Sequence, residues 1–417
     1  MSVEVRCGAL ARHGLTGGAM AAIATIVAVG IATSLMTPLV SLTLASRGIS
    51  ERTIGAVVST YAIAMLFATP HAAGIAARFG AANAMVALTC VAALLIPLIW
   101  ITEGVGWMFP IMFIYGGCIA LCFTLSEFWI AAKTPDRSRG FVIGLYATLL
   151  SLGFAVGPAV IAALGVSTAY PFLIGSALMV LAALPAFLAR RSSPVVHERP
   201  KVRFSTFIFA APVATLGAFA FAVGETGGFA FLPLWGDRLG FSPATAALLI
   251  SAMTLGNVAF QIPLGILADR MDRRLLLLAC GAAGAFGMLI AWSVSTSLPA
   301  LVAVLFLWGG ATAGIYTVGL AHLASRFSGA DLAGANAAFI FCYALGMLAG
   351  PLAIGDAMSR APIAGLPIVM GVVFCAYAII VAFRIARRAG AQNEARRPCG
   401  ATGDILSRIR FRSRARN

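Results

Sequence analysis

Charged residues are scarce in this chain of 417 residues. Asp, Glu, Lys and Arg make up 10% of the sequence, whereas hydrophobic residues make up 61%, and the mean hydropathy is +0.98. Such a composition leaves too few polar side chains to cover the surface of a soluble domain. It excludes a soluble globular protein and supplies enough apolar residues for twelve membrane spans of about 20 residues each.

Lysine is almost missing, since Lys133 and Lys201 are the two in the chain. Neither follows a glycine loop of the GxxxxGK[ST] type, so the sequence has no phosphate cradle for ATP-driven transport. It also lacks HExxH, GxSxG and paired CxxC motifs. We therefore expect neither an enzyme nor a cofactor.

Cysteine is present eight times, at irregular spacings. Cys118 and Cys122 share a helix face, but no third and fourth ligand lies near them in the sequence. We expect small packing residues there and neither a disulfide framework nor a metal site.

Long apolar segments predict an all-α membrane protein with twelve transmembrane helices. The expected spans are residues 19–41, 53–76, 81–100, 108–131, 140–164, 169–188, 206–233, 243–267, 275–295, 298–325, 332–357 and 363–383. The basic start before residue 19 resembles a signal peptide, but the apolar segment that follows is long enough to span the membrane as an uncleaved helix.

Positive charge is distributed unevenly among the loops. With both termini placed in the cytoplasm, Arg47, Arg52, Arg238 and Arg360 are the four basic residues on the outer side. The other Lys and Arg residues lie on the inner side, many of them in the tail, as the positive-inside rule requires. We expect a multi-pass protein of a bacterial inner membrane with cytoplasmic termini, and a basic tail that meets lipid rather than nucleic acid.

The chain repeats at an offset of about 193 residues. YGGCIALCFT at 115–124 returns as WGGATAGIYT at 308–317, and GFAVGP at 153–158 returns as GMLAGP at 346–351. An internal repeat of this length predicts a duplicated bundle. We expect two parallel, pseudo-symmetric six-helix bundles at 1–188 and 206–385, a cytoplasmic linker at 189–205 and a basic cytoplasmic tail at 386–417.

The segment GILADRMDRR at 265–274 resembles the GxxxD(R/K)xGR(R/K) loop of the major facilitator superfamily (MFS), except that Asp272 replaces the later glycine. Its first-half counterpart, AGIAARFGAAN at 73–83, keeps Arg78 and Gly80 but has Ala77 in place of the acid. The segment LSEFWIAAKTPDRSRG at 125–140 is similar to the YcaD-like branch. This resemblance covers residues 19–385 and implies a secondary transporter that works by alternating access.

The resemblance implies a substrate site at mid-membrane, lined chiefly by the first, fourth, seventh and tenth spans. The polar candidates for this cavity are Thr33, Ser34, Thr37, Tyr146, Asn257, Gln261, Tyr316, Thr317 and Asn336.

Three titratable side chains are candidates for proton coupling. Glu225 is expected in the outer part of the membrane and Glu127 close to the cytoplasmic face, while His322 lies near the end of the tenth span. A carboxylate within a membrane is expensive and is a functional hypothesis by default, because a buried carboxyl group can bind and release a proton near neutral pH. The alternatives are a structural hydrogen bond for Glu225, an interfacial salt bridge for Glu127 and packing for His322.

No Lys or Arg is expected inside a membrane span, so a buried anionic substrate would have no counter-charge. We therefore expect a small neutral, cationic or amphipathic substrate, and protons as the second solute. The alternatives are an uncoupled facilitator and a transporter-like scaffold or sensor without flux. We expect the protein to be a monomer in the lipid bilayer.

The two unequal loop motifs predict a cytoplasmic gate. Asp269 is expected to meet Arg137 or Arg139, and Arg78 is expected to meet Asp331, so that the charges are reversed between the two sides. Arg270 and Arg273 belong to the same motif. The alternative is that these are solvated charges that set topology.

Overall fold

The fold consists of membrane-length helices. The structure is a computed structural model that describes residues 16–135, 139–194, 205–327 and 329–396. Its α-helices are α2 (Gly17–Ser46), α3 (Glu51–Ala68), α4 (Ala72–Phe79), α5 (Ala81–Ile101), α6 (Val105–Lys133), α7 (Arg139–Leu164), α8 (Tyr170–Leu188), α9 (Ser205–Ala210), α10 (Pro212–Arg238), α11 (Pro243–Arg270), α12 (Arg273–Ser293), α13 (Leu298–Ala324), α14 (Gly329–Arg360) and α15 (Gly365–Arg396). Among the described residues 12 segments are long and apolar enough to cross a membrane, which confirms the predicted fold class.

Two expected spans differ from the structure. The second is interrupted by a short 3-10 turn at Thr69–His71, where Pro70 lacks the amide hydrogen that a continuing helix needs. The expected span 206–233 is also divided, because α9 ends at Ala210 and α10 begins anew at Pro212. Pro212 takes the first helical position, where a missing N–H is tolerated.

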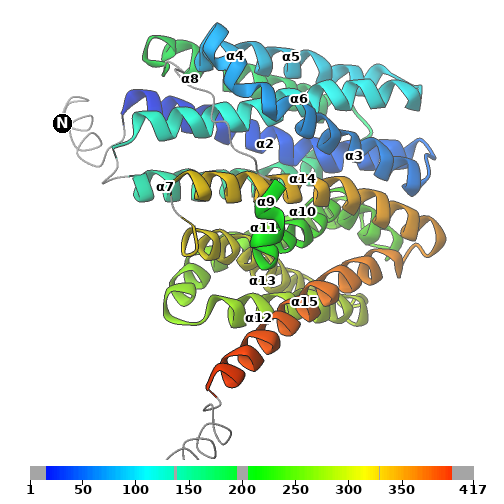
Figure 1. Cartoon of the computed structure of the whole chain (residues 1–417). Coiled ribbons are helices and arrows are strands. Elements are labelled where there is room, and N and C mark those ends of the chain that lie inside the picture. The colour runs from blue at the N-terminus through cyan, green and yellow to red at the C-terminus, as the bar shows by residue number, and fades with distance from the viewer. Residues whose placement is uncertain (1–15, 136–138, 195–204, 328, 397–417) are drawn as a thin grey trace, which may run out of the picture.

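The helix pairings of the first half recur in the second. Here α2 packs on α6, α7 and α8, and α10 packs on α13, α14 and α15; α5 pairs with α8 as α12 pairs with α15. We call α2–α8 the first half and α10–α15 the second half. Figure 1 shows the first half in the upper part of the view and the second half below it. The predicted boundaries at 188, 205 and 385 stay predictions, since much of the linker and tail lies outside the described residues.

The repeat extends to the helix starts. Ser50 caps α3 by accepting from the amide of Thr53, and Ser242 caps α11 by accepting from the amide of Thr245. In both caps the serine hydroxyl also lies within hydrogen-bond distance of the threonine hydroxyl, at 3.0 and 2.9 Å. The second helix of each half is therefore started by the same local chemistry, because a serine oxygen satisfies an otherwise free amide.

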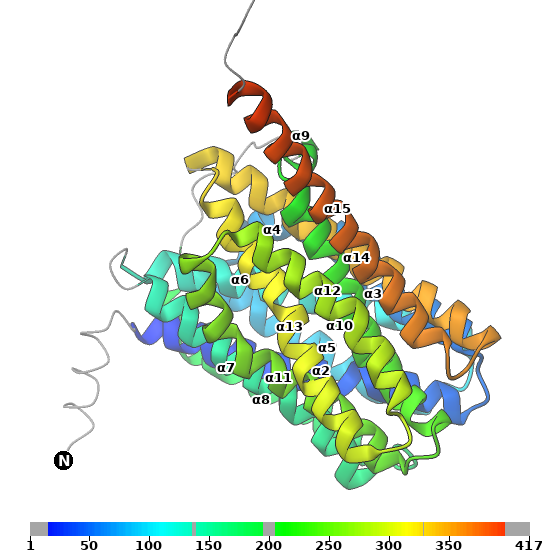
Figure 2. The same cartoon turned by 90° about the horizontal axis from the view of Figure 1, so that it is seen from below.

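Two helix pairs join the halves, namely α3 with α14 and α7 with α11, and α2 also meets α10. The helices alternate in direction, so the starts of α2 and α10 and the ends of α8 and α15 lie at one end of the bundle (Figures 1 and 2). We call this the terminal end. The opposite end, where α2 ends and α3 begins, is called the distal end.

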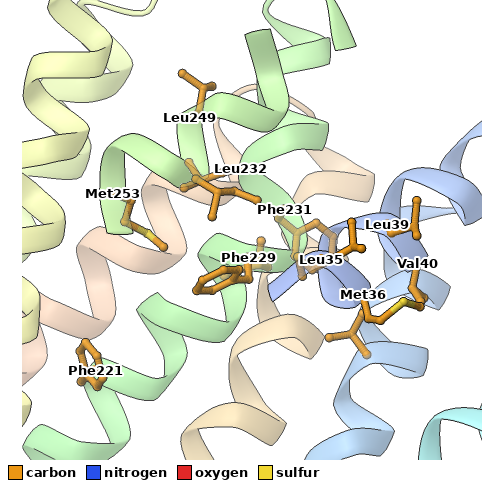
Figure 3. Close-up of a cluster of buried hydrophobic side chains, with 14 of the residues drawn as sticks. Leu35, Met36, Leu39, Val40, Phe221, Phe229, Phe231, Leu232, Leu249 and Met253 are labelled. Atoms are coloured by element: carbon orange, nitrogen blue, oxygen red, sulfur yellow. The ribbon is translucent and has the colours of Figure 1, made fainter. Parts of the chain in front are cut away.

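The seam between α2 and α10 is apolar. Leu35, Met36 and Leu39 of α2 and Phe229 and Phe231 of α10 belong to one buried cluster, and Figure 3 shows these side chains drawn together from the two helices. Such a contact excludes water between the halves on the distal side of the helix centres.

Candidate functional site

Glu225 lies at the centre of α10, halfway between Pro212 and Arg238. The sequence-based estimate, which counted from residue 206, placed it in the outer part of the membrane and is wrong. The break at Ala211 restarts the helix, so the carboxyl group lies about 20 Å from either helix end at 1.5 Å per residue. Glu225 is therefore a mid-membrane residue.

The hydroxyl group of Tyr343, on α14, donates a hydrogen bond to Oε2 of Glu225. Both side chains belong to the second half, and α10 and α14 pack closely because Gly346 and Gly350 lie against the α10 backbone. An added Cβ at either glycine would meet backbone atoms of Phe219 or Val223. Small residues thus bring the tyrosine within reach of the carboxylate.

Aromatic rings surround this pair on the terminal side. Phe221, one turn from Glu225, lies 5.4 Å from Tyr316 and 6.3 Å from Tyr343 between ring centroids. Tyr316 also lies 5.9 Å from Tyr343 and 5.2 Å from Phe339. We call Phe221, Tyr316, Phe339 and Tyr343 the aromatic cluster. It packs around the ring of Tyr343 and holds its hydroxyl group next to the carboxylate.

Glu127 lies on α6 toward the terminal end, as expected. Its partner is a tyrosine from the same half: the hydroxyl of Tyr146, on α7, donates to Oε1 at 3.4 Å. The residue is exposed, unlike the half-buried Glu225. The alternative of an interfacial salt bridge named Lys133, Arg137 or Arg139 as the partner. A pair with Lys133 is not among the ion pairs of the described residues, and Arg137 and the side chain of Arg139 lie outside them.

The two carboxylates have the same kind of partner. Each acid is paired with a tyrosine from the fifth helix of its own half, α7 for Glu127 and α14 for Glu225.

The other expected cavity residues fall into two groups. The hydroxyls of Thr33, Ser34 and Thr37 donate to carbonyls of their own helix, those of Val29, Ile31 and Thr33. Ser34 also faces Gly157 of α7, inside the first half, so its role is packing. The remaining candidates are half-buried on α11, α13 and α14, and they are Asn257, Gln261, Thr317 and Asn336.

His322 is not part of the Glu225 centre. It lies in the last turn of α13 at the terminal end and is 6% exposed. It lines the same pocket as Asp272, Arg273, Arg274 and Arg326, which are all close to the loop between α11 and α12 or just after α13.

The structure describes one side of the expected gate at the terminal end and part of the other. Asp269 pairs with Arg273, one turn away across the short loop, at 3.2 Å. Arg78 and Asp331 are both exposed and form no ion pair with each other. Arg270 is exposed. Pairing of Asp269 with Arg137 or Arg139 stays a prediction, since those two side chains are not described.

Ion pairs do join the halves at the distal end. Arg238 of α10 pairs with Glu51 of α3, and Arg52 of α3 lies 3.6 Å from Asp356 of α14. Asp356 also pairs with Arg360 at 2.7 Å. The sequence shows these residues as balancing charges outside the membrane. It contains no signal for their pairing except that Glu51 and Asp356 lie near glycines where α3 and α14 meet, Gly55 and Gly355.

Sequence reasoning also missed Tyr343, Phe221 and Phe339. These residues read as ordinary apolar or aromatic positions in spans seven and eleven, and their placement around Glu225 depends on how α10, α13 and α14 pack. The one usable signal was Tyr343 itself, a hydroxyl group in the middle of an apolar segment next to the GMLAGP repeat.

Comparison with known proteins agrees with this architecture. The chain is 26% identical over 333 residues to the MFS-type transporter YfkF of Bacillus subtilis strain 168, covering 78% of this chain and 85% of that protein. It is 23% identical over 335 residues to the MFS-type transporter YcaD of Salmonella arizonae, covering 77% of this chain and 84% of that protein.

Solved structures share the fold. A mutant of the nucleoside transporter NupG superposes with a TM-score of 0.74 at 14% identity, covering 89% of this chain and 99% of that chain. A D-xylose-proton symporter superposes with a TM-score of 0.69 at 18% identity, covering 88% of this chain and 96% of that chain. The family profile of the Major Facilitator Superfamily matches residues 21–243 and 214–414. The chain is a multi-pass membrane transporter that belongs to the Major Facilitator Superfamily.

Proposed function

We propose that this protein is a secondary active transporter that couples the movement of a small neutral, cationic or amphipathic molecule to a proton gradient by alternating access. The observation that carries the proposal is the Glu225–Tyr343 pair at the centre of α10. A carboxyl group in the middle of a membrane span is energetically costly, and its presence there therefore favours a functional role. The one hydrogen-bond donor to Glu225 among the described residues is a neutral phenol rather than a cation. Such a group can take up a proton and release it when its surroundings change.

The absence of a buried cation supports the choice of substrate. Every Lys or Arg within the described spans lies among the first or last four residues of its span. An anionic substrate at mid-membrane would meet Glu225 and Glu127 without a counter-charge. A neutral or cationic molecule avoids this penalty.

The conformation supports alternating access. The halves are joined at the distal end by ion pairs and by the α3–α14 contact, whereas Arg78 and Asp331 do not pair with each other at the terminal end. With the termini in the cytoplasm, as the distribution of basic residues favours, this is a state closed toward the outside. Exchange with the opposite state would break the distal pairs and form the terminal ones. The orientation and the bacterial inner membrane are part of this proposal.

Two alternatives remain open to experiment: a facilitator in which both glutamates are structural, and a scaffold or sensor without flux. A metabolite and drug-susceptibility screen of a deletion strain identifies a test compound. Its uptake is then measured in proteoliposomes with and without an imposed pH gradient. Accumulation that requires the gradient supports coupling, flux that ignores the gradient identifies the facilitator, and no flux identifies the scaffold.

Neutralisation assigns the proton site. Glu225→Gln should abolish gradient-driven accumulation and leave downhill exchange partly intact. Glu127→Gln should reduce gradient-driven accumulation to a smaller extent. Glu103→Gln, in the loop between α5 and α6, is the matched control and should behave as the parent. If both membrane variants accumulate the compound as well as the parent at equal abundance, neither residue carries the proton.

A further inference from the structure

A pocket of about 320 Å³ lies at the terminal end of the second half. It is formed where the loop between α11 and α12 meets the end of α13, and its charged and ring-bearing lining residues are Asp269, Asp272, Arg273, Arg274, His322 and Arg326. This pocket is separate from the Glu225 centre, which lies half a helix length away.

His322 is the unusual member of this lining. The side chain is more than nine-tenths buried, and its ring nitrogen Nε2 has no hydrogen-bond partner among the described residues. A buried polar atom without a partner is rare in folded proteins, because it has lost its contact with water and gained nothing in exchange. An unpartnered ring nitrogen beside a polar pocket is therefore a sign of a missing ligand.

The acids of the pocket are already engaged. Asp269 accepts from the guanidinium of Arg273 at 3.2 Å, and Asp272 caps α12 by accepting from the amide of Arg274 at 2.9 Å. Arg273 is fixed further by donating to the carbonyls of Ala268 and Ala321, both at 3.1 Å. Arg273 thus ties the ends of α11 and α13 together, and it lines the pocket.

The field that remains is positive. Three arginines, Arg273, Arg274 and Arg326, line the pocket against two aspartates. Arg326 is exposed, and its guanidinium lies 5.8 Å from the ring centroid of Phe327. A ring N–H and a guanidinium group from residues that line one small pocket form a donor set that recognises an oxyanion.

We propose that this pocket binds a phosphate group through Nε2–H of His322 and the guanidinium group of Arg326. The candidate span of α13 ends at Leu323, next to His322, so a phospholipid phosphodiester is one source of the group. A soluble phosphate is the other. The proposal is independent of the transported substrate and of proton coupling.

The test uses the purified, delipidated full-length protein in detergent. The unfolding temperature is followed during titration with phosphatidylglycerol, with a diacylglycerol of the same acyl chains, and with sodium phosphate against sodium chloride at equal ionic strength. If the unfolding temperature rises with phosphatidylglycerol but not with diacylglycerol, the site binds a lipid phosphate. If the unfolding temperature also rises with sodium phosphate, the site accepts soluble phosphate as well.

The variants show whether the response comes from this pocket. Arg326→Gln and His322→Phe should each weaken the apparent affinity roughly tenfold, as expected for loss of one charge-assisted hydrogen bond, and His322→Gln should restore part of it. Arg270→Gln is the matched control: it removes one positive charge from the same surface but does not line the pocket. The proposal is overturned if neither form of phosphate raises the unfolding temperature, or if Arg270→Gln weakens binding as much as Arg326→Gln does.

Discussion

The carboxylate of Glu51, at the start of α3, and the guanidinium of Arg238, at the end of α10, form an ion pair across the two halves of the transporter. The Glu51 side chain is 13% exposed, so this pair is partly shielded from water. The neighbouring contact of Arg52 with Asp356 joins the same two halves. Both contacts require the distal ends of the halves to be together, and both should favour the state seen here.

Charge reversal tests this distal pair. Glu51→Arg should increase the population of the distal-open state roughly fivefold, since a partly exposed ion pair contributes about 1 kcal/mol. The double variant Glu51→Arg with Arg238→Glu should restore the parental distribution. Spin labels placed on α3 and α14 and measured by pulsed electron resonance report the distance between the distal ends.

Arg360→Gln is the control for that experiment, because Arg360 pairs with Asp356 within α14 and does not cross the seam. It should leave the distance distribution unchanged. The Glu51–Arg238 pair does not hold the distal end closed if Arg360→Gln changes the distance distribution as much as Glu51→Arg does. The same conclusion follows if the double variant shows additive effects without rescue.

Gly55 should be sensitive to a single methyl group. A Cβ at this position would overlap the carbonyl oxygen of Pro351 on α14, and Gly355 faces the carbonyl of Glu51 in the same way. Gly55→Ala should therefore separate α3 from α14, destabilise the distal-closed state by about 1–3 kcal/mol and lower the unfolding temperature. Gly106→Ala has open space around it and gains the same helix propensity, so unchanged or increased stability is expected there. A Gly55→Ala protein with parental stability and parental distances would contradict the close backbone contact.

Tyr343→Phe should separate the hydrogen bond to Glu225 from the packing of the aromatic cluster. The ring stays, and the hydroxyl donor is lost. We expect gradient-driven accumulation to be slower by roughly ten- to hundredfold, because a hydrogen bond to a charged group contributes about 1.5–3 kcal/mol. The infrared carbonyl band that disappears in Glu225→Gln should shift to higher frequency in Tyr343→Phe, since the carboxyl group has lost its donor.

Tyr377→Phe controls for the removal of a buried hydroxyl, because Tyr377 donates to the carbonyl of Val213 and does not contact Glu225. Its infrared band and its transport rate should match those of the parent. If Tyr343→Phe leaves the band in place, the tyrosine does not donate to a protonated or ionised Glu225 in the membrane.

The terminal gate is tested by Arg78→Asp and Asp331→Arg. A single cysteine introduced at Asn257 is labelled by a reagent added on the side of the termini. If Arg78 and Asp331 pair when the terminal ends meet, Arg78→Asp should increase the rate of this labelling several-fold. Adding Asp331→Arg should return labelling to the parental rate. Arg191→Asp, an equal charge change at the same end, should have no such effect. Independent effects of the two substitutions would leave Arg78 and Asp331 as topology charges.

The number of spans and the duplication could be predicted from the sequence, because both depend on local properties. A membrane span requires a run of apolar residues of a given length, and the repeated YGGCIALCFT and WGGATAGIYT segments carry the same packing positions in both halves. The depth of Glu225 could not be predicted, because the residues of α9 are as apolar as those of a membrane span. Only the turn at Ala211 shows where α10 begins.

The partners of the two carboxylates were decided by tertiary structure. Glu225 and Tyr343 are 118 positions apart, and they meet because glycines let α14 approach α10 and because both helices are rotated to face the same side. The distal ion pair likewise joins residues 187 positions apart. By itself, the sequence determined how many helices cross the membrane, that they form two similar halves and which residues are charged. Which charges meet across the seam, and which carboxylate lies at mid-membrane beside a tyrosine, depends on helix rotation and approach, and these result from packing between segments far apart in the chain.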